Sequence, residues 1–389
     1  MKILDLCEFY SERGGGVRSY LNKLTAAAEP RGHEVVVVAP GPRDEFVEQR
    51  GARVLRYAAP RMPYDPSYHW PWRIDRMRAL VKAERPDVLQ VSSPFLPAAV
   101  AMTLGDVPVR AYVHHSDPIG CYLEYGARRL LPRFAAELLV APAWSWMRTV
   151  CRSFDVTIVA GHWLEDVLKQ RGCERVTTVR FGISHSEFGP SRRDVALRRE
   201  LLGSLADDPE ARLLVITGRL AVDKRQRILL AAIKYLSQSR PLALTVLGDG
   251  PDRERIEREA QGMPATKFLS FTRDRTQYAA ILASADALVH GSRCETYGFV
   301  LGETLASGTP MVVPDAGGAT AIATPGCSEK YRPHANAAEI AAAIDRLLDR
   351  PRDELARAAL AAAAEQPTLD EHFDELFGLY GRLVENKRA

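Results

Sequence analysis

Short, almost wholly apolar runs recur along the chain and alternate with longer stretches that have helical spacing. The runs have the length of buried parallel strands. In chain order they are KILDLCEF, EVVVVAP, RVLRYA, DVLQVSS, VRAYVHH, DVTIVAG, VTTVRFG, RLLVITGR, LALTVLGDG, KFLSF, DALVHGS and TPMVVPDAGG. Helix-length stretches such as VRSYLNKLTAAAEPRG, which ends at a glycine, lie between several of them. Strands that alternate with helices predict an α/β fold with parallel sheets.

The length of the chain indicates more than one domain. A chain of 389 residues exceeds the size at which a single hydrophobic core stops growing. The segment FGISHSEFGPSRRD, residues 181–194, is rich in glycine, proline, serine and charge, as a joint between domains is. We therefore expect two doubly wound domains, at 1–185 and 186–366, and ligands of such sheets bind at the carboxyl ends of the strands.

Composition narrows the class of protein. With 46% hydrophobic and 26% charged residues the chain resembles an ordinary soluble globular protein, and a net charge of +3 gives no argument for a nucleic-acid partner. Six scattered cysteines without a CxxC pair fit reduced thiols in the cytoplasm better than disulfides or a zinc site. No apolar run approaches the ~20 residues of a membrane span, and acidic residues by position 5 argue against a signal peptide.

A glycine run follows the first predicted strand. Gly14, Gly15 and Gly16 open the first helix, where glycine lets the backbone approach a ligand and the helix N-terminus offers N–H groups to an anion. A tight strand-to-helix turn is the alternative. The run is not GxGxxG, and no GxxxxGK[ST] occurs, so we expect neither a dinucleotide cofactor nor ATP hydrolysis of the P-loop kind.

Two cations follow the strand RLLVITGR. Arg219 and Lys224 are placed to bind a diphosphate, arginine as a fork and lysine as a point charge. Solvated loop charges are the alternative. The next strand ends in a second glycine turn, Gly248 to Gly250, at the same predicted edge of the sheet.

The segment RCETYGFVLGETLASGTP, residues 293–310, holds two glutamates eight positions apart. Glu295 falls in the loop before a helix, and the backbone N–H groups of 297–299 could receive an anion or a sugar hydroxyl. Glu303 falls within that helix. A carboxylate can accept two hydroxyl groups at once, so one glutamate on a hexose and one on a ribose would explain both. A capping glutamate and a satisfied core glutamate are the alternative.

Together these stretches resemble the retaining glycosyltransferases of the GT-B fold, glycosyltransferase family 4, over nearly the whole chain. The motifs that carry the resemblance are GGGVRSYL, RGHEVVVVAP, RPDVLQVSSP, FGISHSEFGP, GRLAVDKR, LGDGP and ETYGFVLGETLASGTPMVVPDAGG. The resemblance implies two Rossmann-like domains facing across a cleft, with a C-terminal helix at 367–389 that crosses back to the N-terminal domain. It also implies metal-independent transfer of a hexose from a nucleotide-diphosphate sugar with retention, without a cofactor, the donor lying mainly on the C-terminal domain and the acceptor on the N-terminal one.

The same resemblance implies a role for each site residue. Arg219 and Lys224 would bind the diphosphate and offset charge on the leaving group, while Glu295 would hold the sugar hydroxyls and Glu303 the ribose. A histidine after the strand AYVHH would reach the donor sugar, with His115 the better match and His114 the alternative. The implied catalytic residues are His115, Arg219, Lys224 and Glu295. The implied donor-binding residues are Gly15, Gly16, Arg219, Lys224, Gly248, Glu295, Tyr297, Gly298, Phe299 and Glu303.

Two positions depart from the family pattern. Asp223 stands where the family often has glutamate, and Arg225 stands where a glycine usually follows the diphosphate lysine, so this helix start could differ locally. The donor stays open between GDP-mannose and a UDP-hexose, and the acceptor between a glycan, a lipid and a small molecule. A nucleotide-sugar epimerase and a non-catalytic nucleotide-sugar-binding protein are the alternative functions.

Basic and aromatic residues gather in two other places. The stretch 126–153 mixes arginines with Trp144, Trp146 and leucines, which predicts a helix that lies on an anionic membrane face, here the inner face. A helix pair packed on the sheet with an exposed basic side is the alternative. The segment YHWPWRIDRMR, residues 68–78, could border the acceptor site.

Overall fold

The chain folds into two α/β units. The computed structural model describes residues 1–10, 15–49, 52–63, 66–263, 265–270, 272 and 274–389. One unit consists of Met1–Arg180 together with Asp370–Ala389, and the other of Phe181–Leu369. The sequence placed the limits at 185 and 367, within the same two connections. Gly14 and Phe271, which entered the sequence predictions, lie outside the described residues.

The first unit is built on a sheet whose strand order among the described residues is β3-β4-β2-β1-β5-β6-β7-β8. Every neighbouring pair is parallel except β3 with β4. Strand order reverses at β1, which lies between β2 and β5. The strands are β1 Lys2–Leu6, β2 Glu34–Gly41, β3 Glu45–Gln49, β4 Ala52–Ala58, β5 Val88–Val91, β6 Val109–His114, β7 Val156–Val159 and β8 Val176–Thr178.

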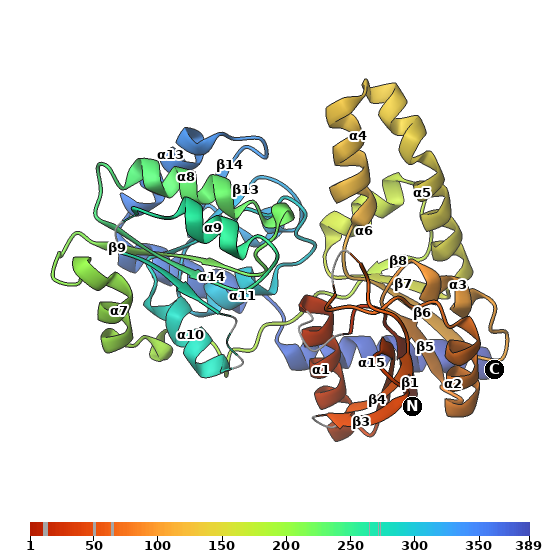
Figure 1. Ribbon diagram of the computed structural model, residues 1–389. Coiled ribbons are helices and arrows are strands. Elements are labelled where there is room, and N and C mark those ends of the chain that lie inside the picture. The colour runs from red at the N-terminus through yellow and green to blue at the C-terminus, as the bar shows by residue number, and fades with distance from the viewer. Residues whose placement is uncertain (11–14, 50–51, 64–65, 264, 271, 273) are drawn as a thin grey trace. The chain divides into compact units, whose positions relative to one another are not determined.

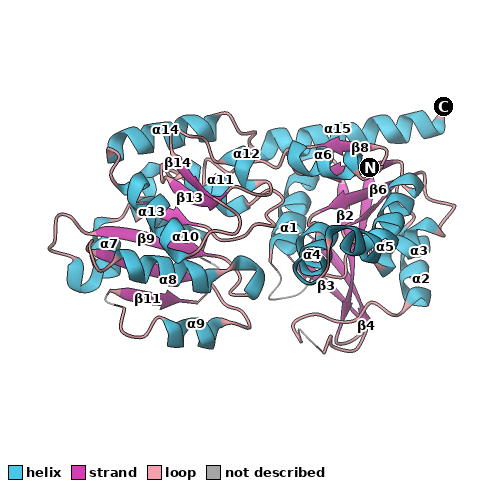
Figure 2. Cartoon of the chain, turned by 90° about the horizontal axis from the view of Figure 1, so that it is seen from above, coloured by secondary structure: helices cyan, strands magenta, loops and turns pink. Residues whose placement is uncertain are grey.

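Helices lie on both sides of this sheet (Figure 2). Its core joins strand residues such as Leu4 and Val36 to helix residues such as Val81 and Leu164, all buried. The helices of this unit are α1 Gly16–Ala28, α2 Ile74–Glu84, α3 Leu96–Met102, α4 Tyr125–Leu130, α5 Arg133–Ser153, α6 His162–Gln170 and α15 Leu369–Arg388, with the short helices η1 Glu29–Arg31 and η2 Ile119–Glu124, the latter a π-helix.

The terminal helix α15 completes the first unit. Its apolar face is buried, and the Tyr380 hydroxyl donates to Gln90 Oε1 at 2.7 Å. At its start, Arg31 pairs with Asp370 at 2.9 Å and with Asp374 at 2.6 Å. The last twenty residues of the chain are therefore part of a unit whose other residues all precede 181.

The second unit has a parallel sheet of strand order β11-β10-β9-β12-β13-β14. Helices α8, α9 and α13 cover one face and α7, α10, α11 and α14 the other (Figure 1). The strands are β9 Arg212–Thr217, β10 Leu242–Leu247, β11 Thr266–Leu269, β12 Ala287–Val289, β13 Met311–Pro314 and β14 Ser328–Tyr331. The helices are α7 Val195–Leu202, α8 Gln226–Leu236, α9 Arg253–Glu259, α10 Arg275–Ser284, α11 Phe299–Ala306, α12 Ala319–Ile322, α13 Ala337–Leu348 and α14 Arg352–Ala364, with the 3₁₀ turns η3 Pro190–Arg192, η4 Gly203–Leu205 and η5 Val222–Lys224.

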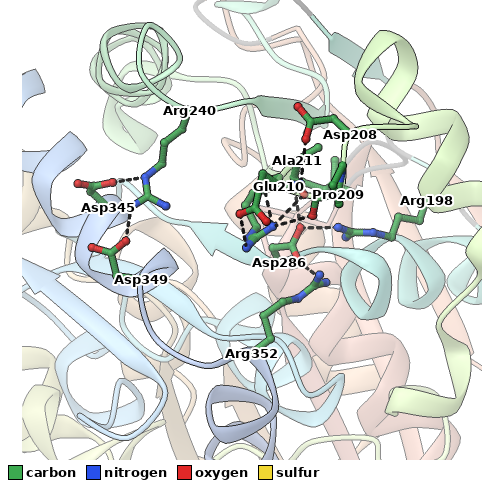
Figure 3. Close-up of polar contacts among 12 residues, drawn as sticks. Arg198, Asp208, Pro209, Glu210, Ala211, Arg240, Asp286, Asp345, Asp349 and Arg352 are labelled. Atoms are coloured by element: carbon green, nitrogen blue, oxygen red, sulfur yellow. Dashed lines mark hydrogen bonds and ion pairs between the residues drawn. The ribbon is translucent and has the colours of Figure 1, made fainter.

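A buried aspartate ties three elements of the second unit together. Asp286, immediately before β12, accepts from the Leu213 amide and from Arg198 of α7, both at 2.7 Å, and also pairs with Arg352 of α14 (Figure 3). Its side chain is 1% exposed. Because a buried carboxylate needs charged or N–H partners, these contacts fix both helices against the start of the sheet.

Two strands escaped the sequence analysis. Strand β3 pairs antiparallel to β4 at one edge of its sheet, and β14 lies at one edge of the other. Neither EFVEQ nor SEKY is an apolar run, because each contains charged residues. All six cysteines are thiols. Among the helices of the described residues, none is long and apolar enough to cross a membrane.

Candidate functional site

The loops that carry the predicted cations and Glu295 emerge side by side in the second unit. Strands β9 and β12 are parallel neighbours, and the order of strands reverses between them. The loops after their carboxyl ends therefore border the point where sheets of this kind bind ligands. A Cβ on Gly291, after β12, would lie 2.5 Å from the carbonyl oxygen of Lys224. This glycine lets the two loops approach backbone to backbone.

Lys224 and Glu295 form an ion pair, with Nζ 2.9 Å from Oε2. His290 Nε2 lies 3.5 Å from the same oxygen. Burial alone would raise the pKa of Glu295, but Lys224 and His290 together hold the pKa well below its usual range. The Glu295 side chain is 16% exposed, so a charged carboxylate stays reachable beside a lysine. We name Lys224, His290 and Glu295 the switch-point cluster.

Glycines shape the loop that presents Glu295. Gly298 has φ +79°, and a Cβ there would lie 2.8 Å from Cγ of Glu295. Gly318 donates its N–H to the Glu295 carbonyl at 2.6 Å, and a Cβ on it would lie 2.3 Å from the Thr296 carbonyl. Gly318, in the DAGG stretch after β13, therefore allows the backbone of this stretch to pack directly on the Glu295 loop.

Glu303 lies on α11 and is buried. Its Oε1 accepts from Arg275 Nη2 at 2.7 Å, and the same guanidinium pairs with Glu187 at 3.0 Å. Arg275 also lies over the rings of Phe188 and Tyr278, 4.9 and 5.4 Å from their centroids. Glu303 is therefore held by one charged partner, separate from the partner that holds Glu295.

The start of α11 is packed by aromatic rings. Phe299 stacks on Phe181 with ring centroids 5.3 Å apart, and Tyr297 meets Phe181 edge-on at 5.4 Å. Gly298 is the N-cap of this helix in the left-handed region, and no side chain caps the helix N-terminus. The aromatic packing fixes the direction of α11, and with it the position of Glu303.

Gly248 has a structural role within the described residues. It has φ +150°, and a Cβ on it would lie 2.0 Å from the carbonyl oxygen of Gly218. The loop after β10 is thereby joined to the loop after β9, which is confirmed by the bond from the Leu220 amide to the Asp249 carbonyl at 2.9 Å. The backbone of Arg219 lies in this joined region, and its carbonyl accepts from Gln226 Nε2 at 2.8 Å.

Arg225, one of the two positions that depart from the family pattern, adopts the conformation that a glycine there would favour. Arg225 has φ +54° and forms the N-cap of α8, and its guanidinium donates to the Pro333 carbonyl at 2.9 Å. A non-glycine residue tolerates this left-handed conformation at some cost. The helix start is therefore formed even though the residue is arginine, held by a bond to a distant loop.

The other predicted residues belong to the first unit. Gly15 is the N-cap of α1 and Gly16 its first residue. A Cβ on either would meet no described atom within 4 Å, so the packing of the described residues does not explain glycine there. Approach of a ligand to the amides remains the explanation that the sequence suggested.

His115 follows β6 and lies in a hydrogen-bonded chain. Its Nε2 is 3.1 Å from Ser92 Oγ, and the Ser92 hydroxyl donates to Asp5 Oδ2 at 2.7 Å. Burial, with smaller effects of His114 and His372, lowers the pKa of His115 to about 3, so the ring is neutral at physiological pH.

His114 differs from its neighbour. It is buried, its Nδ1 contacts the Tyr112 hydroxyl, and burial lowers its pKa to about 3. His115 is less buried, as a ligand-contacting residue should be. The structure thus distinguishes the two histidines by burial, and His115 remains the candidate.

Sequence analysis did not single out His290, Arg275, Ser92 or Asp5. His290 was visible as the polar end of a predicted strand, but its partner lies across a loop, and Arg275 is 28 positions from Glu303. Within the described residues, no three histidine, cysteine, aspartate or glutamate side chains are grouped to hold a metal ion.

Comparison with known proteins agrees with this geometry. Residues 14–187 match Glycosyltransferase Family 4, and residues 211–350 match Glycosyl transferases group 1. The chain is 30% identical over 365 residues to GDP-mannose-dependent alpha-(1-6)-phosphatidylinositol dimannoside mannosyltransferase of Mycobacterium tuberculosis (strain ATCC 25177 / H37Ra), which covers 92% of this chain and 91% of the relative.

Solved structures support the fold. Sucrose-phosphate synthase of Thermosynechococcus elongatus aligns with a TM-score of 0.80 at 18% identity, over 99% of this chain and 100% of the other. Anabaena Alr3699/HepE in complex with UDP and glucose aligns with a TM-score of 0.72 at 18% identity, over 98% and 99%. This chain therefore belongs to the glycosyltransferases of family 4 and group 1 and has the GT-B fold.

Proposed function

We propose that this glycosyltransferase moves a hexose from a nucleotide-diphosphate sugar with retention at the anomeric carbon and without a metal ion. The observation that carries the proposal is the switch-point cluster, a lysine and a partly exposed glutamate held together where the strand order of the second sheet reverses. A lysine there supplies positive charge to a diphosphate, and a carboxylate supplies acceptors to sugar hydroxyls.

In the proposed reaction the bond between the anomeric carbon and the diphosphate oxygen breaks, and the acceptor oxygen bonds to that carbon from the same face. The acceptor proton passes to the departing diphosphate. Lys224 and Arg219 would offset the negative charge that grows on this leaving group, which is the part of catalysis that fixed charges perform best. Because these two side chains would balance the charge of the diphosphate, the proposed reaction needs no metal ion.

Glu303 would hold the ribose hydroxyls. In the structure its carboxylate pairs with Arg275, and in this proposal the ribose hydroxyls donate to the same carboxylate. For the neutral His115, and for the amides of Gly15 and Gly16, contact with the donor sugar and with the distal phosphate stays a prediction from the sequence.

The donor that we favour is GDP-mannose, because a relative at 30% identity across nearly the whole chain is named for that donor. A UDP-hexose is the second choice, since a structural neighbour was solved with UDP and glucose. The mannosyltransferase at 30% identity is also named for a phosphatidylinositol dimannoside, so we favour a lipid-linked glycan acceptor. We propose that the reaction takes place in the cytoplasm, which the six free thiols support.

The test begins with donors. Purified protein is screened by thermal shift against GDP-mannose and a panel of UDP-hexoses, and the stabilising donor is then supplied with lipid and glycan acceptors. Nuclear magnetic resonance of the product gives the anomeric configuration. Inversion would overturn the retaining assignment. Donor binding without transfer to any acceptor and without hydrolysis would favour a binding protein.

A second arm tests the charge assignment. Lys224→Gln should reduce turnover strongly, whereas Lys234→Gln, which removes an exposed charge from α8 of the same unit, should not. Activity should persist in EDTA. Loss of activity in EDTA that magnesium or manganese restores would show that the diphosphate charge is balanced by a metal instead.

A further inference from the structure

The hairpin formed by η2, α4 and α5 extends beyond the sheet of the first unit (Figure 1). Its far end carries large apolar side chains that are mostly in solvent. Leu130 is 83% exposed, Leu138 71% and Phe134 69%. Isolated exposed apolar side chains are ordinary, but a contiguous group marks an interaction surface. We name this group the hairpin tip, and its residues are Leu130, Leu131, Phe134, Leu138 and Leu139.

Helix α5 is apolar on two faces in its first half. The face that includes Ala136, Val140 and Met147 is buried in the core of the first unit. Phe134 and Leu138, one helical turn apart, face away from that core and are exposed. A helix that is apolar all round is normally buried on all sides. Packing in the core accounts for the apolar side chains of one face only. It does not account for the exposed apolar side chains of the hairpin tip.

Arginines surround the hairpin tip. Arg128, Arg129 and Arg133 are exposed, and Arg128 pairs with the buried Glu124 and lies 3.9 Å from Glu137. Arg133 also pairs with Glu137 at 3.0 Å. Three arginines of the hairpin against Glu137 leave its end positive, because Glu124 is also held by Arg171. Long arginine side chains can keep their charge in a polar layer while neighbouring leucines enter an apolar one.

We propose that the hairpin tip inserts into the interface of an anionic lipid bilayer. An apolar end flanked by arginines has the two properties that interfacial binding requires, apolar area for the acyl boundary and positive charge for the headgroups. A narrow protruding hairpin presents little flat area to a second protein, whereas a fluid bilayer closes around it. A second copy of this chain is the competing occupant and is an outcome of the test.

This inference does not rest on the proposed reaction. It uses only contacts and exposures of the first unit, and it extends the sequence prediction for 126–153 by naming the residues that enter the lipid. The face of α5 that contains Trp144 is excluded from insertion, because Trp144 is buried and lies under Arg171, 4.9 Å from the ring centroid. Insertion is confined to the hairpin tip.

The experiment is sedimentation of the full chain with vesicles of phosphatidylcholine alone or mixed with phosphatidylglycerol. Wild type should sediment with the mixed vesicles, less with neutral ones, and less as salt rises. The triple variant Leu130→Ser, Phe134→Ser, Leu138→Ser should lose at least about tenfold in affinity, since three apolar side chains no longer leave water. The variant Arg129→Gln, Arg133→Gln should bind both vesicles about equally weakly.

The matched control is Val195→Ser, Tyr235→Ser, which removes exposed apolar side chains of the second unit, 71% and 59% exposed, and should bind as wild type does. Circular dichroism verifies that every variant folds. Wild type that fails to sediment with mixed vesicles, or a triple variant that binds as wild type does, would overturn the proposal. So would light scattering that shows wild type as a dimer, the triple variant as a monomer, and neither bound to vesicles.

Discussion

Two buried carboxylates and the partly exposed Glu295 have pKa values shifted in opposite directions. Burial raises the pKa of Asp5 and of Glu8 to about 7, because their partners are hydroxyl and amide groups. Glu295 instead has a lysine 2.9 Å away, and its pKa is lowered. A neutral donor offsets only part of the cost of burying a charge, whereas a cation offsets more. Asp5 and Glu8 are thus close to titration at neutral pH, and Glu295 is charged.

The two glutamates of residues 293–310, Glu295 and Glu303, should differ in their effect on the binding of nucleoside diphosphate. Glu303→Gln should weaken the binding of GDP and of the intact donor by similar factors, because both contain the ribose. The expected loss is roughly 10- to 150-fold in affinity, or about 1.5–3 kcal/mol. Glu295→Gln should leave GDP affinity unchanged or raise it, since Lys224 loses a competing carboxylate, while turnover falls. Calorimetry with GDP and a transfer assay measure the two effects.

In both variants glutamine has nearly the same shape as the glutamate that it replaces, which limits misfolding. A thermal melt without ligand serves as the control. Reversed behaviour, in which Glu295→Gln loses GDP and Glu303→Gln does not, would exchange the two roles. Unfolding of both variants would instead indicate that the carboxylates are structural.

Asp5 should make the first unit less stable as pH rises. Its folded pKa, about 7, is above the usual 3.8, so the folded state binds the proton more tightly than the unfolded chain. The stability that this proton supplies is complete below about pH 3.8 and is lost as pH rises through about 7. In Asp5→Asn this contribution disappears, so stability should depend less on pH across that window.

Tryptophan fluorescence can follow this effect in one unit, because all five tryptophans precede residue 181. Urea unfolding at several pH values gives the slope. Asp106→Asn, which removes an exposed charge from the same unit, controls for net charge. An unchanged slope in Asp5→Asn would mean that another group, such as Glu8, is responsible.

Much of the candidate site could be predicted residue by residue, but its pairings could not. Lys224 and Glu295 were chosen separately for a diphosphate and a sugar, and the structure joins them although they are 71 positions apart. Their contact depends on β9 and β12 being neighbours, which strand-like runs do not specify. Arg275 and Ser92 were missed for the same reason, since each acts through a partner from another element.

At the scale of elements, the contacts of Asp286 should stabilise the second unit. Asp286→Asn leaves Arg198 and the partner arginine of α14 without their carboxylate, and disrupting a buried pair in this way typically costs about 3–5 kcal/mol. Far-ultraviolet circular dichroism during urea unfolding should show the loss. The tryptophan signal, which belongs to the other unit, should change less.

Asp345→Asn is the matched control. Asp345 pairs with Arg240 on the same unit (Figure 3), but its side chain is 40% exposed. Exposed pairs contribute less than about 1 kcal/mol, so this variant should unfold nearly as wild type does. Equal losses in the two variants would refute the claim that burial makes Asp286 important.

The elements themselves were largely predictable because buried parallel strands are apolar on both faces. Runs such as EVVVVAP and LALTVLGDG became β2 and β10. EFVEQ and SEKY contain charged residues and lack that signal, which is why β3 and β14 were missed, whereas the edge strands β8 and β11 were found. The hairpin of α4 and α5 was predicted as a basic, aromatic helix, but only exposures could show which residues its core leaves uncovered.

At the scale of the whole molecule, the end of the chain should stabilise the unit that contains its beginning. Leu376 of α15 is fully buried, so Leu376→Ala should cost about 2–5 kcal/mol. Urea unfolding followed by tryptophan fluorescence should report the loss, because the tryptophans lie in that unit. Glu375→Ala, an exposed neighbour on the same helix, should change stability by less than about 0.5 kcal/mol. A fluorescence transition unaffected by Leu376→Ala would contradict this coupling.

The return of α15 also sets an order of events on the ribosome. The second unit is continuous in sequence, so it can fold once residue 369 has emerged, whereas the first unit must wait for residues 370–389 although most of it was made earlier. Until then, the surface that α15 covers stays open to water and to chaperones. The half of the enzyme that is translated first is therefore the half that finishes folding last.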